Sequence, residues 1–212
     1  MVPENIRFRF TKTGSLQFIS HLDLCRTVKT ALVRTKIPIW YSEGFNPHPK
    51  MVFALPLSIG IQSECELVDI KLTGEPDSYD GIKNRFSAAF TEEMKIIEAY
   101  KPVRKFSEIA WAEYDIFFDG DCASLPADFF EGSLVVTKRT KSGEKETDIL
   151  PWIKRARVFA DEGKINVLLS SSGESYLNPD YVAAAVSARI GVADYSIMRK
   201  NMYLSDGKSI FA

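Results

Sequence analysis

The apolar residues of this chain switch between strand-like and helix-like spacing in a fixed order, and this order constrains the fold most. Over residues 6–12 apolar and polar side chains alternate, the period-2 pattern of a strand with one buried face. Over residues 21–35 apolar side chains recur at three- and four-residue intervals, the pattern of an amphipathic helix. The first elements are therefore a strand, whose solvent face with Arg7 and Arg9 is expected to be cationic, and then a helix.

The start of this helix is marked by a capping box. Ser20 precedes the first helical residue, and Asp23 lies three positions after it. A serine hydroxyl in this position accepts a hydrogen bond from the third N–H group, and the carboxylate lies in the positively charged first turn. We predict a helix over His21–Thr35 whose polar side carries a second basic surface, formed by Arg26, Lys29 and Lys36.

The rest of the first half continues this order of elements. We expect strands at 39–44, 51–59 and 66–72, a helix at 82–90 and a strand at 94–99. Pro56 is expected at an edge or a bulge, because proline has no N–H group to donate to a ladder. Strand, helix, paired strands, helix and strand is the order of a ferredoxin-like module.

The second half repeats this order in outline after a linker at 101–107. The expected elements are a strand at 109–118, a short helix at 125–130, hairpins at 133–150 (turning at 141–143) and 152–170, a helix at 179–189 and a strand at 195–204. The sequence thus predicts an α+β protein of two ferredoxin-like modules with mainly antiparallel sheets, residues 1–104 and 105–212. No sequence repeat relates the two halves.

The loop Gly44–Pro49 has the composition most suggestive of a binding site. Prolines 47 and 49 fix their own φ angles and restrict the residues before them, so that Asn46 and His48 are held extended. A loop that is already rigid pays less entropy to present polar and aromatic groups to a ligand. The alternative is a turn that Gly and Pro stiffen for structural reasons alone, with His48 merely solvated.

Catalytic and metal-binding signals are weak in this sequence. His21 is suited to acid-base chemistry, but it lies one helical turn before Cys25 beside the apolar stripe, which favours a structural role. Metal binding by His21, Cys25, His48 and Cys65 would need ligands that no recognisable spacing brings together. The sequence also contains no phosphate loop, dinucleotide fingerprint, zinc-protease motif or serine-hydrolase motif. We therefore expect no metal and no cofactor.

Composition places the chain among ordinary globular proteins, with 45% apolar residues among 212. Three scattered cysteines and the lack of a signal-like start indicate a reducing, cytoplasmic setting, and no apolar run is long enough to span a membrane. The net charge is −1, but Lys and Arg concentrate in residues 1–50 and 137–157 whereas residues 106–137 carry only acids. Such segregation occurs in nucleic-acid-binding proteins and also on ordinary solvated faces.

Several motifs resemble those of the radical SAM-linked protein family. They are Ser20–Leu24 with Arg26, the segment Ile37–Lys50, Pro56–Gly60 with Ser63–Asp69, and Arg139–Ile153. Leu150 departs from the arginine, and Cys25 from the plain apolar residue, that the family pattern carries there. The resemblance implies a bacterial domain of unknown function that is encoded beside a radical SAM enzyme or fused to it. It implies no activity.

Two classes of function follow from these observations. In the first, the chain is a non-catalytic RNA-binding or substrate-presenting partner of a radical SAM enzyme, with tRNA or rRNA as a possible ligand and no membrane association. In the second, it is an RNA-processing enzyme that uses His48 or His21 as its acid-base group. The first is preferred. The expected binding residues are Ser20, His21, Arg26, Tyr41, Ser42, Asn46, His48 and Lys50.

Overall fold

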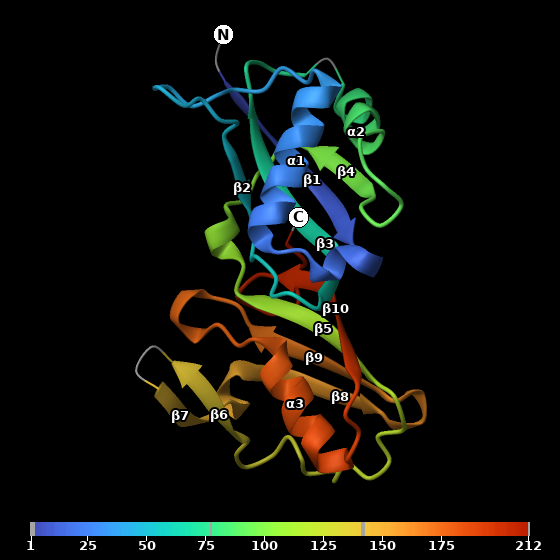
Figure 1. Cartoon of the computed structure of the whole chain (residues 1–212). Helices are drawn as coiled ribbons and strands as arrows, with labels where there is room; N and C mark the ends of the chain where they lie inside the picture. The colour runs from blue at the N-terminus through green and yellow to red at the C-terminus, as the bar shows by residue number, and fades with distance from the viewer. Residues whose placement is uncertain (1–2, 77, 141–142, 212) are drawn as a thin grey trace. The chain divides into compact units, whose positions relative to one another are not determined.

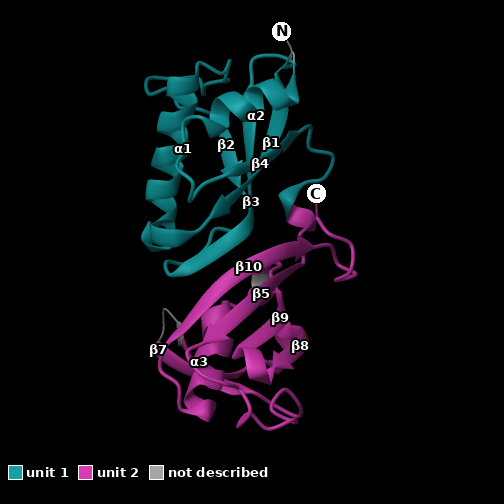
Figure 2. Ribbon diagram, turned by 90° about the vertical axis from the view of Figure 1, so that its right-hand side faces the viewer, with its two compact units in different colours: residues 1–106, 212 teal, residues 107–211 magenta. Residues whose placement is uncertain are grey.

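The chain divides into two compact units in the computed structural model, which describes residues 3–76, 78–140 and 143–211. One unit extends to Phe106, and the other extends from Ser107 to Phe211 (Figure 2). The expected domain boundary between 104 and 105 lies two residues away from this division. That the two units are ferredoxin-like domains remains a prediction.

Unit 1 carries a four-stranded sheet and two helices. Its elements are β1 (Glu4–Lys12), α1 (His21–Thr35), β2 (Met51–Phe53), β3 (Ile61–Leu72), α2 (Tyr79–Ser87) and β4 (Ile96–Tyr100). The strands run antiparallel in the order β4-β1-β3-β2. Both helices belong to the core on one face of this sheet, where Phe8 of β1 meets Leu32 of α1 and Phe86 of α2.

The predicted start of α1 is confirmed in detail. The Ser20 hydroxyl oxygen accepts a hydrogen bond from the Asp23 N–H group (3.1 Å), and the same hydroxyl donates to the Asp23 carboxylate (2.7 Å). The helix ends at Thr35, and Lys36 follows it in the left-handed conformation with φ 53°. A local signal thus sets both the position and the phase of the helix.

Two of the strands expected in unit 1 are shorter or absent. Residues 39–44 form only isolated bridges, from Ile39 to Leu72 and from Tyr41 to Pro49. Pro38 directly precedes this segment and Pro49 lies opposite Tyr41, and neither proline supplies an N–H group for a ladder. The strand expected at 51–59 ends at Phe53. Leu55 then adopts a positive φ of 39°, which turns the chain away from the sheet before Pro56.

Unit 2 carries a second four-stranded sheet, one helix and a separate hairpin. Its elements are β5 (Trp111–Phe118), β6 (Val135–Thr140), β7 (Gly143–Asp148), β8 (Ile153–Phe159), β9 (Lys164–Ser170), α3 (Pro179–Ile190) and β10 (Tyr195–Tyr203). The antiparallel order of the main sheet is β10-β5-β9-β8, and β6 pairs with β7. The helix α3 lies against this sheet (Figure 1). Its residues Val182 and Val186 are fully buried.

The prediction of a short helix at 125–130 is wrong. This segment forms separate turns, such as the one in which Phe129 N–H donates to Pro126 C=O (3.0 Å). A six-residue stretch gains too few hydrogen bonds to repay helix nucleation, and its aromatic side chains pack against one another instead. The β6–β7 hairpin follows β5 where unit 1 has its first helix, and the centre of its expected turn, residues 141–142, lies outside the described residues.

The α+β class with mainly antiparallel sheets is confirmed. Within the described ranges, the three α-helices do not include one that combines the length and apolar character needed to cross a membrane.

The capping box of α1 can be tested by removing its hydroxyl. We expect Ser20→Ala to lower the free energy of unfolding by about 1 kcal/mol, because the Asp23 N–H group loses its acceptor. Urea denaturation gives this difference. Thr30→Ala, at an exposed position of the same helix, is the control and should not destabilise the protein. Equal effects of the two substitutions would contradict the capping role.

A second test concerns the turn between β8 and β9. Gly163 and Gly191 both lie in the left-handed region, so alanine at either position costs about 1 kcal/mol. A Cβ atom at Gly163 would also lie 2.2 Å from the Gly120 carbonyl oxygen, whereas nothing lies within 4 Å at Gly191. We expect Gly163→Ala to cost about 1–3 kcal/mol more than Gly191→Ala in urea denaturation. Similar losses would show that the close approach is not needed for stability.

Candidate functional site

The face of the unit 1 sheet opposite its helices presents two rows of polar side chains. Alternate residues of β1 point into the core, so Asn5 and Arg7 point away from it. Strand pairing places Asn5 opposite Lys71 and Arg7 opposite Asp69. Asn5 and Lys71 thus form one row, and Arg7 and Asp69 form the other. Lys50, directly before β2, extends the row of Asn5 and Lys71, because the Lys50 carbonyl accepts a hydrogen bond from Lys71 N–H (3.0 Å).

Arg7 is fully buried, contrary to the expected cationic solvent face of the first strand. Its guanidinium forms two hydrogen bonds with the Asp69 carboxylate (2.7 and 2.9 Å) and donates to the Arg104 carbonyl (2.8 Å). The ring of Phe106 lies over it, with 4.2 Å between Cζ and the ring centroid. The chain that follows β4 therefore covers this part of the sheet. Arg9 was also expected on that face, and the backbone register of β1 with β4 places it opposite Glu98.

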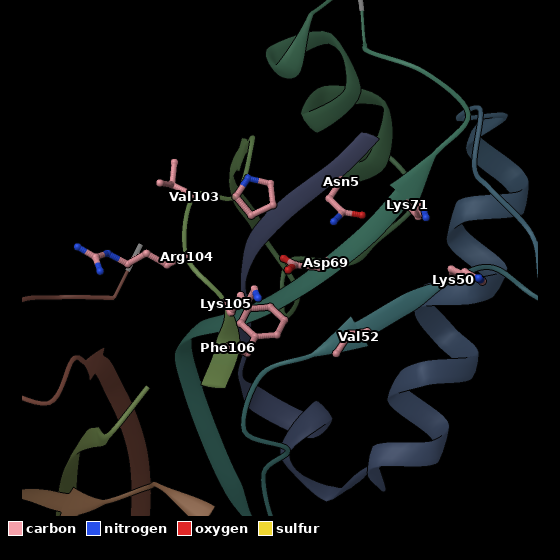
Figure 3. Close-up of a pocket in the computed structure, with 10 residues that line it drawn as sticks. Asn5, Lys50, Val52, Asp69, Lys71, Val103, Arg104, Lys105 and Phe106 are labelled. Atoms are coloured by element: carbon pink, nitrogen blue, oxygen red, sulfur yellow. The ribbon is translucent and has the colours of Figure 1, made fainter. Parts of the chain in front are cut away.

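A pocket remains beside this covered region. Its volume is about 570 Å³, within the range of small-molecule sites (Figure 3). The lining residues are Asn5, Lys50, Val52, Asp69, Lys71 and the segment 102–106. In Figure 3 the Arg104 side chain points away from the other lining residues, so its backbone rather than its charge contributes to the wall.

Three lysines line the pocket, Lys50, Lys71 and Lys105, and the first two of them are adjacent on the sheet. Lys50 and Lys71 occupy adjacent positions on neighbouring chain segments, and within the described part of the chain neither forms an ion pair (Figure 3). Lys71 Nζ lies 5.8 Å from the centroid of the Trp40 ring. Asp69, the only acid in the lining, is already neutralised by Arg7. Like charges placed directly opposite destabilise a sheet, so this arrangement is suited to receive an anion.

The loop before Lys50 is braced by a serine and a histidine. The Ser42 hydroxyl oxygen accepts a hydrogen bond from His48 N–H (3.1 Å) and lies 2.9 Å from His48 Nδ1, while Ser42 N–H donates to the His48 carbonyl (2.8 Å). His48 Nδ1 also lies 3.3 Å from the Asn46 carbonyl oxygen. The imidazole is exposed to solvent. The structure thus brings three of the expected binding residues together.

Aromatic rings stand exposed on this braced loop. The Phe45 side chain is fully exposed and Tyr41 is 41% exposed. An exposed phenylalanine on a braced loop gains no core packing, and such rings are available for stacking on a ligand or for a partner.

The start of α1 forms a separate group. Ser20 and Asp23 satisfy each other, and Asp23 pairs with Arg26 (2.9 Å), so the turn carries its own counter-charge. The hydrogen bonds to Ser20 and Arg26 hold the pKa of the Asp23 carboxyl below its usual value. An ionised carboxylate in this turn opposes the binding of an anion there.

His21 and Cys25 lie together on this first part of the helix. His21 Nε2 lies 3.5 Å from Cys25 Sγ, and the imidazole packs edge-on against Phe53, with 5.3 Å between ring centroids. Burial raises the pKa of the Cys25 thiol, which keeps it a poor nucleophile and metal ligand. The structural role expected for His21 fits these contacts.

The expected binding residues therefore do not share one concave site. α1 is about 22 Å long, and the loop that carries His48 leaves from the C-terminal end of this helix, away from Ser20 (Figure 1). Of the eight expected residues, Lys50 alone lines the described pocket. The other lining residues were not expected, among them Asn5, Lys71 and Phe106. The alternation of β1 places Asn5 on the outer face, but only the strand register brings it next to Lys71.

Metal-ligating side chains do not gather anywhere in the described ranges: no group of three or more His, Cys, Asp or Glu residues is placed to hold an ion. The absence of a metal in the working protein stays a prediction.

Comparison with known proteins identifies the family. A family described as an uncharacterized protein conserved in bacteria (DUF2344) matches residues 5–179, which include the pocket lysines, the braced loop and the start of α1. The chain therefore belongs to this family. No curated protein matches the chain.

The buried arginine can be tested through its partner carboxylate. We expect Asp69→Asn to lower the free energy of unfolding by about 3 kcal/mol, because it leaves the guanidinium of Arg7 buried without a counter-charge. Asp23→Asn changes the same chemical group in the exposed pair with Arg26 and should cost less than about 1 kcal/mol. Equal small losses in urea denaturation would mean that water reaches Arg7.

Proposed function

We propose that this member of the bacterial family is a non-catalytic RNA-binding module that uses the pocket on the outer face of the unit 1 sheet. The observation that carries the proposal is the pair of adjacent lysines, Lys50 and Lys71, neither of which forms an ion pair with the residues that the structure describes. Phosphate groups supply the missing charge, and contacts from lysine to phosphate provide much of the affinity of RNA-binding proteins.

The net charge of the chain does not oppose this proposal. A total of −1 excludes a strong general attraction for polyanions, but a local site depends on the charges that line it. Here Arg7 neutralises Asp69, so the positive charges of Lys50 and Lys71 remain uncompensated by that carboxylate. Binding of this kind is local and specific rather than spread over the surface.

The braced loop extends the proposed interface. Phe45 and Tyr41 are exposed rings on a segment that ends at Lys50, and exposed rings of this kind can stack on the bases of a single strand. Because Ser42 and His48 brace the loop, little entropy is lost when it engages RNA.

The proposal also covers the fold of the two units and a partner enzyme. The order β4-β1-β3-β2 and the matching order β10-β5-β9-β8 support an interpretation as two ferredoxin-like modules, the second with a hairpin in place of its first helix. We interpret the protein as a cytoplasmic partner that presents tRNA or rRNA to a radical SAM enzyme. The sequence resemblance supports the choice of partner enzyme.

One contact favours the second function, an RNA-processing enzyme. His48 Nδ1 lies 2.9 Å from Ser42 Oγ, the reach of a base and a nucleophile. The Ser42 hydroxyl also accepts the backbone N–H of His48, however, and this bond fits a structural brace. His21, the other histidine considered for catalysis, packs against Phe53.

The proposed function is tested by titrating fluorescent single-stranded RNA with the protein and measuring anisotropy. We expect Lys50→Ala/Lys71→Ala to weaken binding at least tenfold, since each lysine contributes a charge-assisted contact worth about 1.5–3 kcal/mol. The melting temperature should stay within about 2 °C, because neither lysine forms an ion pair that folding needs.

The control removes the same number of charges from another surface. Lys29→Ala/Arg34→Ala changes two exposed cations of α1, which packs on the other face of the sheet, and should leave RNA affinity within about twofold. A larger loss in the control than in the pocket variant would move the interface to the helix. Cleavage of the RNA that depends on His48 would favour the enzymatic function.

A further inference from the structure

The chain after β4 limits how much of the sheet a ligand can reach. Phe106 covers Arg7, and Arg7 has no exposed surface, so the outer face over β1 is closed to solvent at this row. The opening that remains is lined by residues of β3, β2 and the start of β1, and its volume is about 570 Å³. A polynucleotide cannot cross the sheet from edge to edge here. The space suits one nucleotide at the end of a chain, or a free nucleotide.

The charge of Lys50 and Lys71 matches a terminal phosphate monoester better than a phosphodiester inside a chain. A phosphodiester inside an RNA chain carries a single negative charge, whereas a terminal phosphate monoester carries about −1.5 to −2 at pH 7. Lys50 and Lys71 place two positive charges side by side, and Asp69, the acid among the described lining residues, is paired with Arg7. A terminal monoester neutralises both, and a diester leaves one lysine uncompensated.

The rest of the pocket offers groups for a base. Phe106 lines the pocket while Arg7 holds its ring in place from the side of the sheet, so this ring forms a fixed platform for stacking (Figure 3). Arg7 lies two residues along β1 from Asn5, the partner of Lys71, which is about 7 Å at the usual rise of a strand. Asn5 adds an exposed amide next to Lys71, which can both donate and accept hydrogen bonds.

We infer that the pocket is a site for a nucleoside monophosphate group, with the phosphate monoester between Lys50 and Lys71 and the base on Phe106. The source of this group is a phosphorylated end of an RNA or a free mononucleotide. The RNA arm of this inference rests on the proposed function, which it sharpens from single-stranded RNA in general to its phosphorylated terminus.

Isothermal titration of the full chain with small ligands tests the inference directly. AMP should bind at least tenfold more tightly than adenosine, because adenosine lacks the dianion, and more tightly than ribose 5-phosphate, because that ligand lacks the base. Equal affinities for AMP and adenosine, or no detectable binding of AMP, would overturn the inference. Inorganic phosphate alone measures the contribution of the anion.

Two variants separate the two halves of the pocket. Lys71→Ala should reduce the affinity for both AMP and ribose 5-phosphate about tenfold. Phe106→Leu should reduce the affinity for AMP about tenfold and leave that for ribose 5-phosphate within about twofold, and this second ligand also shows that the variant is folded. Lys29→Ala is the matched control and should change neither affinity. If Phe106→Leu left AMP binding unchanged, the base would not lie on this ring.

Oligonucleotides of one sequence with a 5′-phosphate, a 3′-phosphate or hydroxyl ends identify the source. Tighter binding of one phosphorylated form, lost in Lys50→Ala/Lys71→Ala, supports a phosphorylated RNA end and shows which end it is. Equal binding of all three, still dependent on the lysines, would retain RNA binding but overturn the terminal site. Binding of AMP but of no oligonucleotide would retain the site as one for a free nucleotide and overturn the proposed function.

Discussion

The ion pair between Arg7 and Asp69 is the constraint on which the outer face of unit 1 depends. A guanidinium in the middle of a sheet must be solvated or paired, and here two hydrogen bonds to a carboxylate and one to the Arg104 carbonyl replace water. The carbonyl and the Phe106 ring come from the segment after β4, so pairing of the cation also fixes that segment against the sheet. The wall of the pocket is thus a consequence of burying one charge.

The same ion pair decides the electrostatic character of the pocket. Asp69 would otherwise compensate Lys71, its neighbour two residues along β3, and the pocket would carry one positive charge fewer. Because the carboxylate is committed to Arg7, the positive charge of Lys50 and Lys71 remains available. The expected basic face of the first strand is therefore replaced by a basic pocket one strand away. Its charge comes from residues that the sequence separates widely.

The parts of the structure that local signals determine could be predicted from the sequence. The capping box predicted the start of α1 at His21. The helix expected from residue 179 also begins there, where the Asn178 side chain accepts a hydrogen bond from Asp180 N–H. The contact between Arg7 and Asp69 joins residues 62 positions apart, and it depends on a strand register that no local pattern reveals. For the same reason Lys50 was found through its place beside a rigid loop, whereas Lys71 was missed inside what reads as an ordinary strand.

The braced loop ends at the pocket lysine Lys50, and backbone hydrogen bonds connect it to Lys71 as well. Trp40 C=O accepts a hydrogen bond from Lys50 N–H (3.1 Å), and Trp40 N–H donates to the Lys71 carbonyl (2.7 Å), so the base of the loop is tied to both pocket lysines through the backbone. Tyr41 and Pro49 form the next bridge, and Ser42 and His48 the brace beyond it. The two lysines and the ring-bearing loop are therefore held in one continuous backbone network, whereas Ser20 and Arg26 are joined to neither. The position of the base of the loop relative to the two lysines is therefore set by backbone hydrogen bonds.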